Sequence, residues 1–348
     1  MAVETGRVDR RRLIRVAGAA AVTAAAVWLA ARNVHIHRVR SALGEATFVW
    51  LLPCPVICIV LNLIRGEIWR QLLGRRVTPA QAFWAYSVGF LANNVLPFRV
   101  GEAARVIVLS NRSALPIVEV AAAAGLERLL DMAVLALMLA VVGPAVAHVP
   151  GLMSGALLIV ALVAAALVVI AALARFRDAP PSVLERAARR LPPAARGAII
   201  GRWLDLARGL AVLLRPSVGI PAAAGSVVVW TLTVASQWLV LRAFQPGAAA
   251  TDAAIMVAAV SLASALPAAP GFVGVYHWAG QQSLIAAFPE RYDPSMALAA
   301  ATVAHAVSFV TSTALGVGGL WYFGMPPSAM TNALRDGRSV PARVEEAS

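Results

Sequence analysis

Long runs of apolar residues, separated by short polar stretches, dominate the pattern of hydrophobic and polar positions along this chain. An α-helix needs about 20 apolar residues to cross the hydrocarbon core of a bilayer. The runs that fit a single crossing are Leu13–Ala31, Ala46–Leu63, Ile117–Val142, Leu152–Leu173, Val218–Leu241 and Met296–Phe323. The pattern therefore predicts an all-α polytopic membrane protein with six full transmembrane helices.

Two further apolar stretches are interrupted near their middle by helix-breaking residues. Ala82–Ser110 is broken at Pro97 and Gly101, and Ala253–Phe288 is broken at Pro267–Gly271. Because proline removes an amide donor and clashes with the preceding turn, each stretch is expected to form two short helices. We predict two re-entrant helical hairpins in a possible inverted repeat, since paired breaks in the two halves are typical of such transporters. Ordinary helix pairs joined by tight turns are the alternative.

Arginine-rich segments predict the orientation in the membrane, because positively charged loops stay on the cytoplasmic side. Arginines gather in the N-terminus (1–12), the segment 65–76, an amphipathic segment (175–215) and the polar tail (324–348). The loop 32–40 also carries three Arg and argues against this orientation, but the larger clusters outweigh it. We expect a transmembrane domain over 13–323 in a bacterial inner (plasma) membrane. Both termini are then cytoplasmic, and the hairpins enter from opposite faces.

Composition excludes several function classes. Apolar residues make up 60% of the chain and charged residues 14%, whereas about a quarter of a soluble domain is charged. The chain has no Lys, so a P-loop or Schiff-base lysine is absent and nucleotide-driven pumping by this chain alone is not expected. The net charge is +13, and the arginines that cause it cluster between the apolar runs. This placement favours lipid headgroups over nucleic acid as the partner. No cofactor and no metal are expected.

The first candidate site lies at the first interruption. It comprises Asn93, Asn94, Pro97, Arg99, Glu102 and Arg105. Pro97 and Gly101 free backbone amides, and a guanidinium at the break, that of Arg99, is suited to grip phosphate in a bidentate fork. Glu102 and Arg105 face each other if the helix resumes. A cytoplasmic loop with solvated charges is the alternative.

The second candidate site is a charged triplet inside a predicted crossing: Glu127, Arg128 and Asp131. Glu127 and Asp131 share one helix face, and Arg128 can reach Asp131. Ionisable residues at that depth point to function, with partners inside the bundle, and Arg99 or Arg105 is the expected partner. A structural ion pair that fixes helix packing is the alternative, and both interpretations can hold together.

The third candidate site is the second interruption, with Pro270, Gly271, Gly274 and His277. Half-helix N-termini there would present free N–H groups to an anion. His277 could couple transport to protons, although a structural histidine is the commoner role.

These motifs resemble the transmembrane region of the lysylphosphatidylglycerol synthase family, also described as flippase-like membrane proteins. The family pattern Leu-Pro-x-Arg-x-Gly-Glu-x-x-Arg matches Leu96–Arg105, and its Glu-Arg-x-x-Asp pattern matches Glu127–Asp131. The resemblance covers roughly Arg10 to Phe323 and implies lipid translocation. The chain departs from the family at Phe272, where a second Gly is usual, and at His277, where Glu is common. The soluble synthase domain is absent from the sequence, so lysyl transfer is not implied.

The predicted function is therefore a flippase that moves a phospholipid or a lipid-linked sugar headgroup across the membrane. Its expected partners are membrane lipids, either anionic phospholipid or polyprenyl-linked sugar. An alternative is a non-transporting subunit that supports a lipid synthase or glycosyltransferase through the segment 175–215. A third is an enzyme acting on a polyprenyl-phosphate sugar, with Glu102 or Asp131 as base. Recognisable catalytic motifs are missing from the sequence, so an enzyme is the less favoured interpretation.

Overall fold

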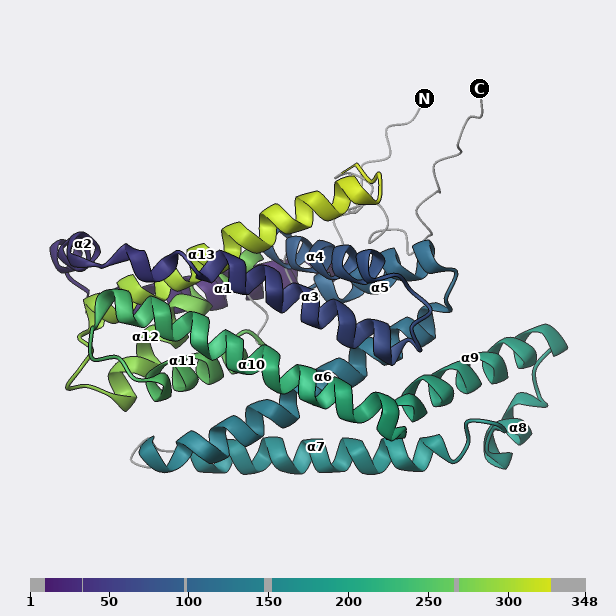
Figure 1. Ribbon diagram of the computed structural model, residues 1–348. Helices are drawn as coiled ribbons and strands as arrows, with labels where there is room; N and C mark the ends of the chain where they lie inside the picture. The colour runs from purple at the N-terminus through teal and green to yellow at the C-terminus, as the bar shows by residue number, and fades with distance from the viewer. Residues whose placement is uncertain (1–9, 33, 97–98, 147–151, 266–268, 327–348) are drawn as a thin grey trace, which may run out of the picture.

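The computed structural model describes residues 10–32, 34–96, 99–146, 152–265 and 269–326, and every regular element in these ranges is helical. The α-helices are α1 (Arg10–Ala31), α2 (Ile36–Glu45), α3 (Cys54–Leu72), α4 (Pro79–Val95), α5 (Gly101–Ser113), α6 (Ile117–Val142), α7 (Leu152–Ala174), α8 (Ser182–Ala188), α9 (Pro193–Ala211), α10 (Pro216–Phe244), α11 (Ala250–Ala263), α12 (Val275–Ala287) and α13 (Pro294–Tyr322). Four 3-10 turns join them: η1 (Phe48–Leu51), η2 (Gly143–Val146), η3 (Val212–Leu214) and η4 (Pro270–Phe272). The predicted all-α class is confirmed, and the long helices run roughly side by side in one bundle (Figure 1).

Within the described ranges, four helical segments are long and apolar enough to cross a membrane. They are Phe48–Leu72, Leu157–Ala174, Pro216–Phe244 and Pro294–Tyr322, which overlap four of the six predicted crossings. The helix α6 has the necessary length of 26 residues, but ionisable side chains lie in its middle. Such a helix is compatible with lipid only when its charged face is covered by neighbouring helices. The count of six crossings and the inverted repeat stay predictions.

Both predicted helix breaks are present. The first break separates α4, which ends at Val95, from α5, which begins at Gly101. The second break separates α11 from α12 and contains the short turn η4. Pro97 in the first break and residues 266–268 in the second lie outside the described residues.

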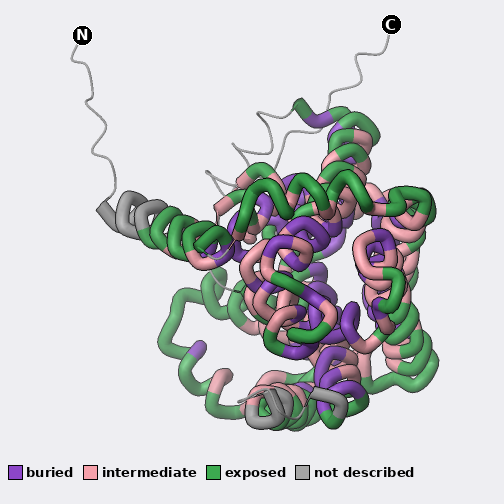
Figure 2. Tube along the Cα trace, turned by 90° about the vertical axis from the view of Figure 1, so that its left-hand side faces the viewer, coloured by how far each residue is buried: buried purple, intermediate pink, exposed green. Residues whose placement is uncertain are grey.

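Small residues let the central helices approach one another closely, as is usual between helices in membranes. The helix α13 packs along α4, and a Cβ atom on Gly319 would lie only 2.8 Å from the carbonyl oxygen of Trp84. Buried residues gather in the middle of the bundle and exposed residues lie on its outer faces (Figure 2). Many exposed side chains on the long helices are large and apolar, for example Leu157, Val168 and Val310. Apolar outer faces fit a protein surrounded by lipid.

The predicted amphipathic segment folds into α8 and α9, which project from one end of the bundle (Figure 1). The chain then returns toward the bundle, and the last turns of α9 pack against α6 and α7. Ala207 and Ala211 are 2% exposed, and a Cβ atom on Gly209 would lie 3.0 Å from that of Ala122. The C-terminal half of α9 is therefore an integral part of the bundle.

Candidate functional site

One turn in the middle of α6 carries the charged side chains at the centre of the site. Glu127 is 0% exposed and Asp131 is 2% exposed, and their i, i+4 spacing puts both on the same helix face. Arg128 is 36% exposed and sits at the edge of that face. A buried carboxylate is tolerated only when donors surround it, so the partners of these two acids define the site.

Glu127 accepts hydrogen bonds from three neighbouring helices. Its Oε1 receives Arg65 Nη1 at 3.0 Å and the Tyr86 hydroxyl at 2.7 Å. Its Oε2 receives the Trp69 indole at 2.7 Å and Arg105 Nη1 at 2.8 Å. Arg128 of the same helix adds a longer contact to Oε1 at 3.4 Å. Five donors, three of them charged, thus surround one carboxylate and stabilise its ionised form in the interior.

Asp131 extends the same network one turn further along α6. It accepts from Arg65 at 3.1 Å and from the Trp230 indole at 2.9 Å, and it pairs with Arg128 at 3.3 Å. We call this set the buried charge cluster: Arg65, Trp69, Tyr86, Arg105, Glu127, Arg128, Asp131 and Trp230. Its members come from α3, α4, α5, α6 and α10, so it connects helices from both halves of the chain.

Four members of this cluster were not among the residues singled out by the sequence: Arg65, Trp69, Tyr86 and Trp230. The sequence places Arg65 in the basic segment 65–76, but its guanidinium reaches the interior and bridges both carboxylates. A signal is present in the sequence, because Arg65 and Trp69 are four positions apart and share one helix face just after the apolar run Ala46–Leu63. Nothing local distinguishes Trp230 from the other tryptophans.

The first break is held by amide side chains. The Asn93 Oδ1 accepts the backbone N–H of Gly101 at 2.8 Å, which caps the start of α5. The Asn94 Nδ2 donates to the hydroxyls of Ser312 and Thr313 at 3.0 and 2.9 Å, which ties the break to α13. In the same break, Arg99 has φ 52°, a left-handed backbone conformation that few non-glycine residues adopt. The predicted pairing of Glu102 with Arg105 is present.

The second break is equally unusual in its backbone. Gly271, Phe272 and Gly274 have φ of 67°, 58° and 83°, so three residues within one short turn lie in the region that favours glycine. Phe272 is therefore a non-glycine residue in a conformation that glycine adopts at lower cost. The Gly274 N–H donates to Nδ1 of His277 at 3.2 Å, so this imidazole caps α12. His277 also lies against His305, with ring centroids 4.9 Å apart.

The two breaks meet each other in the bundle. The Arg99 guanidinium lies over the Phe272 ring, with its central carbon 5.7 Å from the ring centroid. A Cβ atom on Gly271 would lie 3.4 Å from the Asn94 carbonyl oxygen and 2.7 Å from the Phe309 ring. The contact therefore joins residues more than 170 positions apart, each at the tip of an interrupted helix pair.

Arg99 leaves the charges of the neighbouring buried charge cluster unbalanced. Arg99 experiences the charges of Glu102, Arg105 and Arg128, so it belongs electrostatically with the buried charge cluster. Together they place four guanidinium groups against three carboxylates: Arg65, Arg99, Arg105 and Arg128 against Glu102, Glu127 and Asp131. The Nε atoms of Arg99, Arg105 and Arg128 are buried and lack a hydrogen-bond partner among the described residues. One excess positive charge and unused donors suit a monoanion such as a phosphate diester.

The described residues contain no group of three or more His, Cys, Asp and Glu side chains placed to hold a metal ion. The sequence-predicted residues divide between two places. Glu102, Arg105, Glu127, Arg128 and Asp131 come together in one network. The rest of the described set, Asn93, Asn94, Arg99, Pro270, Gly271, Gly274 and His277, forms the junction of the breaks.

Comparison with known proteins agrees with this membrane setting. Residues 16–316 match the family described as Lysylphosphatidylglycerol synthase TM region, and the match includes both breaks and the whole buried charge cluster. A curated relative, Glycosyltransferase AglD of Haloferax volcanii, is 28% identical over 375 residues. That alignment covers 97% of this chain and 58% of the relative, so the chain spans less than two thirds of that protein's length. No solved structure matches the chain.

Proposed function

We propose a lipid-translocating function for this chain, which belongs to the lysylphosphatidylglycerol synthase TM region family. The headgroup of a phospholipid or a lipid-linked sugar would pass between leaflets along the junction of the two breaks. The observation that carries the proposal is the half-buried Arg99, whose Nε has no partner among the described residues, at the tip of one break and facing the other. A buried guanidinium nitrogen without a hydrogen-bond partner is costly, and a bound anion would lower that cost.

The network behind Arg99 supports a role in positioning. Arg105 is 3% exposed and held between Glu127 and Glu102, so its planar group cannot turn away. Arg128, which is 36% exposed, is more accessible than Arg65 and Arg105 in the same network. A passing phosphate would exchange water for these fixed donors, and such exchange lowers the barrier for moving a charged headgroup through lipid.

The proposed setting is the inner membrane of a bacterium, with six crossings, two re-entrant hairpins from opposite faces and both termini cytoplasmic. The pairing of the breaks at one junction supports this arrangement, because transporters with discontinuous helices bind substrate where the breaks meet. Arginines concentrated on α8 and α9 support a cytoplasmic position for that end.

Reconstitution tests the proposal. The purified full chain would be placed in vesicles with fluorescent phosphatidylglycerol, phosphatidylethanolamine or a short polyprenyl-phosphate sugar. Loss of inner-leaflet fluorescence to a membrane-impermeant quencher reports translocation. We expect wild-type protein to move at least one of these lipids, and Arg99→Gln to slow it roughly tenfold or more, because a charge-assisted contact is lost.

Arg189→Gln is the matched control, since Arg189 is an exposed arginine on the projecting end whose side chain has no described partner. It removes the same charge and should leave the rate unchanged. Folded wild-type protein that moves none of the lipids would refute translocation. Equal rates for Arg99→Gln and wild type would remove Arg99 from the path.

A second function is favoured by the comparison with the relative named a glycosyltransferase, in which the aligned region is only part of a longer chain. This chain would then support a separate glycosyltransferase, with the exposed arginines of α8 and α9 as the contact. Because α9 packs into the bundle, deleting it would disturb the fold. Replacing Arg186, Arg189, Arg190 and Arg196 with Gln is the cleaner test. If this variant lowers glycosyltransferase activity in cells but moves lipid in vesicles at the wild-type rate, the supporting role is favoured.

A further inference from the structure

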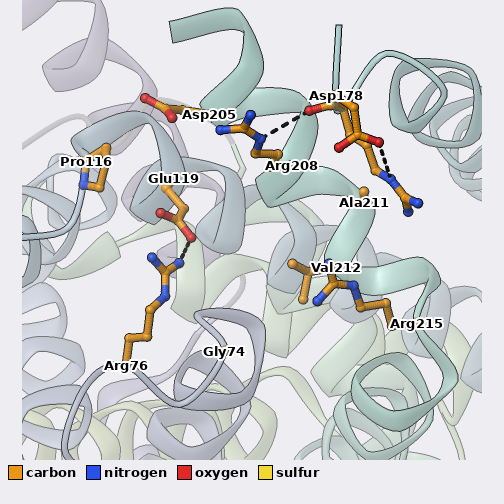
Figure 3. Close-up of a pocket in the computed structure, with 11 residues that line it drawn as sticks. Gly74, Arg76, Pro116, Glu119, Asp178, Asp205, Arg208, Ala211, Val212 and Arg215 are labelled. Carbon is orange, nitrogen blue, oxygen red and sulfur yellow. Dashed lines mark hydrogen bonds and ion pairs between the residues drawn. The ribbon is translucent and has the colours of Figure 1, made fainter. Parts of the chain in front are cut away.

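A second charged region lies at the end of the bundle where α9 rejoins it. A cavity of about 740 Å³ opens there between the α3–α4 loop, the start of α6, the end of α7 and the end of α9 (Figure 3). We call it the surface cavity, lined by Gly74, Arg76, Pro116, Glu119, Arg177, Asp178, Asp205, Arg208, Ala211, Val212 and Arg215. Its volume lies in the usual range for small-molecule sites, roughly 300–1,000 Å³.

Charge pairing leaves part of this lining unused. Arg76 pairs with Glu119, and Arg177 pairs with Asp178 at 3.3 Å. Arg208 uses only its Nε, which donates to the Arg177 carbonyl at 3.1 Å. This bond orients the guanidinium while its two terminal nitrogens stay free of partners among the described residues.

Arg215 is a second cavity arginine with guanidinium nitrogens free of described partners. Its side chain makes no hydrogen bond or ion pair with the described residues, and it borders the cavity from just before α10. The Asp205 carboxylate has no ion pair with a described residue, and it lies across the cavity from Arg215 (Figure 3). Arg208 and Arg215 thus both line the cavity, and the terminal guanidinium nitrogens of both have no partner among the described residues, which suits binding of an anion.

Exposed apolar residues that adjoin two cavity arginines in the chain favour a lipid over a free anion. Phe176 is 39% exposed and Leu214 is 46% exposed, and each directly precedes a cavity arginine in the chain. A basic recess with apolar neighbours at the end of a membrane bundle offers sites for both parts of an amphiphile. We propose that the surface cavity binds the phosphate-bearing headgroup of an anionic phospholipid, whose chains lie against these apolar residues.

This site is separate from the junction of the breaks. Glu119 in the cavity precedes Glu127 by eight residues on α6, which is about 12 Å along the helix axis. The inference goes beyond translocation, because it concerns binding at equilibrium at a second place in the molecule.

Direct binding to the purified full chain in a neutral detergent tests the site. The probe is dihexanoyl phosphatidylglycerol below its micelle concentration, followed by calorimetry or thermophoresis. We expect Arg208→Gln/Arg215→Gln to weaken binding about tenfold, since two charge-assisted contacts are lost. Unchanged affinity in this double variant would overturn the proposal.

The matched control is Arg196→Gln/Arg202→Gln, two exposed arginines on the same helix outside the cavity. It should bind as wild type does; an equal loss in the control would show a general charge effect and refute a specific site. If the cavity double variant fails to fold, Arg215→Gln alone removes a side chain without described partners and should weaken binding severalfold.

Two further probes identify what the cavity recognises. Dihexanoyl phosphatidylcholine keeps the chains and the phosphate but adds a cation, so it should bind more weakly. Inorganic phosphate should compete poorly, and competition at equal affinity would contradict a lipid site. Binding should survive Arg99→Gln, so its loss there would place the lipid at the junction instead. This binding measurement does not depend on lipid translocation, so the surface cavity can be tested even if the vesicle assay shows no transport.

Discussion

The buried charge cluster with Arg99 and Glu102 contains four arginines and three acids, and so does the surface cavity, but the two regions use them differently. In the buried charge cluster, Glu127 and Asp131 are surrounded by guanidinium, phenol and indole donors from five helices. In the surface cavity, Asp178 is 83% exposed and its arginine partner is adjacent in sequence. The comparison shows that burial, and not composition, turns charged residues into a fixed scaffold.

Removing the central carboxylate should have the largest effect. Glu127→Ala leaves Arg65 and Arg105 facing each other inside the bundle without their shared partner, so we expect a loss of about 3–5 kcal/mol in unfolding free energy. Reversible unfolding of the purified protein in mixed micelles measures it. Asp178→Ala is the control for the surface cavity and should change stability by less than about 1 kcal/mol. Equal losses in the two variants would contradict the comparison.

An intermediate effect is expected from the neutral donors. Trp230→Phe keeps the aromatic ring but removes the indole N–H that donates to Asp131, and a buried acceptor left short of a donor costs about 1–3 kcal/mol. The same unfolding measurement applies. Trp321→Phe, at a side chain 89% exposed, should be neutral. A neutral Trp230→Phe would mean that the arginines alone satisfy Asp131.

The smallest change in unfolding free energy is expected at Phe272, together with a change in the rate of lipid translocation. Glycine relieves a left-handed backbone conformation worth about 1–2 kcal/mol, which offsets part of the packing that the ring provides. Both Phe272→Gly and Phe272→Leu remove the ring that lies under the Arg99 guanidinium. If that contact holds the junction closed, both variants should translocate lipid severalfold faster in vesicles.

Rates equal to wild type in both Phe272 variants would mean that this ring does not restrain Arg99. Faster transport in Phe272→Gly alone would assign the effect to the backbone. The pair of substitutions therefore separates the aromatic contact from the strain.

Local patterns in the sequence were sufficient for much of the fold. Apolar run length predicted the helical class, and four runs coincide with segments that can cross a membrane. Proline and glycine predicted both breaks, because their effects on the backbone are local. The pairings of Glu102 with Arg105 and of Arg128 with Asp131 followed from helical spacing for the same reason.

Contacts between distant helices were beyond such patterns. Arg65 and Trp230 reach Asp131 across 66 and 99 positions, and only the packing of α3 and α10 on α6 brings them there. The surface cavity is a similar case. The segment 175–215 is expected from sequence to form amphipathic surface helices. In the structure, Ala207, Gly209 and Ala211 allow α9 to pack against α6 and enclose a recess.

By itself, the sequence determined that this is a helical membrane protein. It also showed that two hydrophobic stretches are interrupted and that another hydrophobic stretch, 117–142, contains charged residues. It could do so because helix formation, helix breaking and hydrophobic length depend on neighbouring residues alone. Only the tertiary structure decided which charges neutralise one another, that Arg99 meets Phe272, and which arginines keep free donors. Those outcomes depend on the distances between helices far apart in the chain, which no local pattern records.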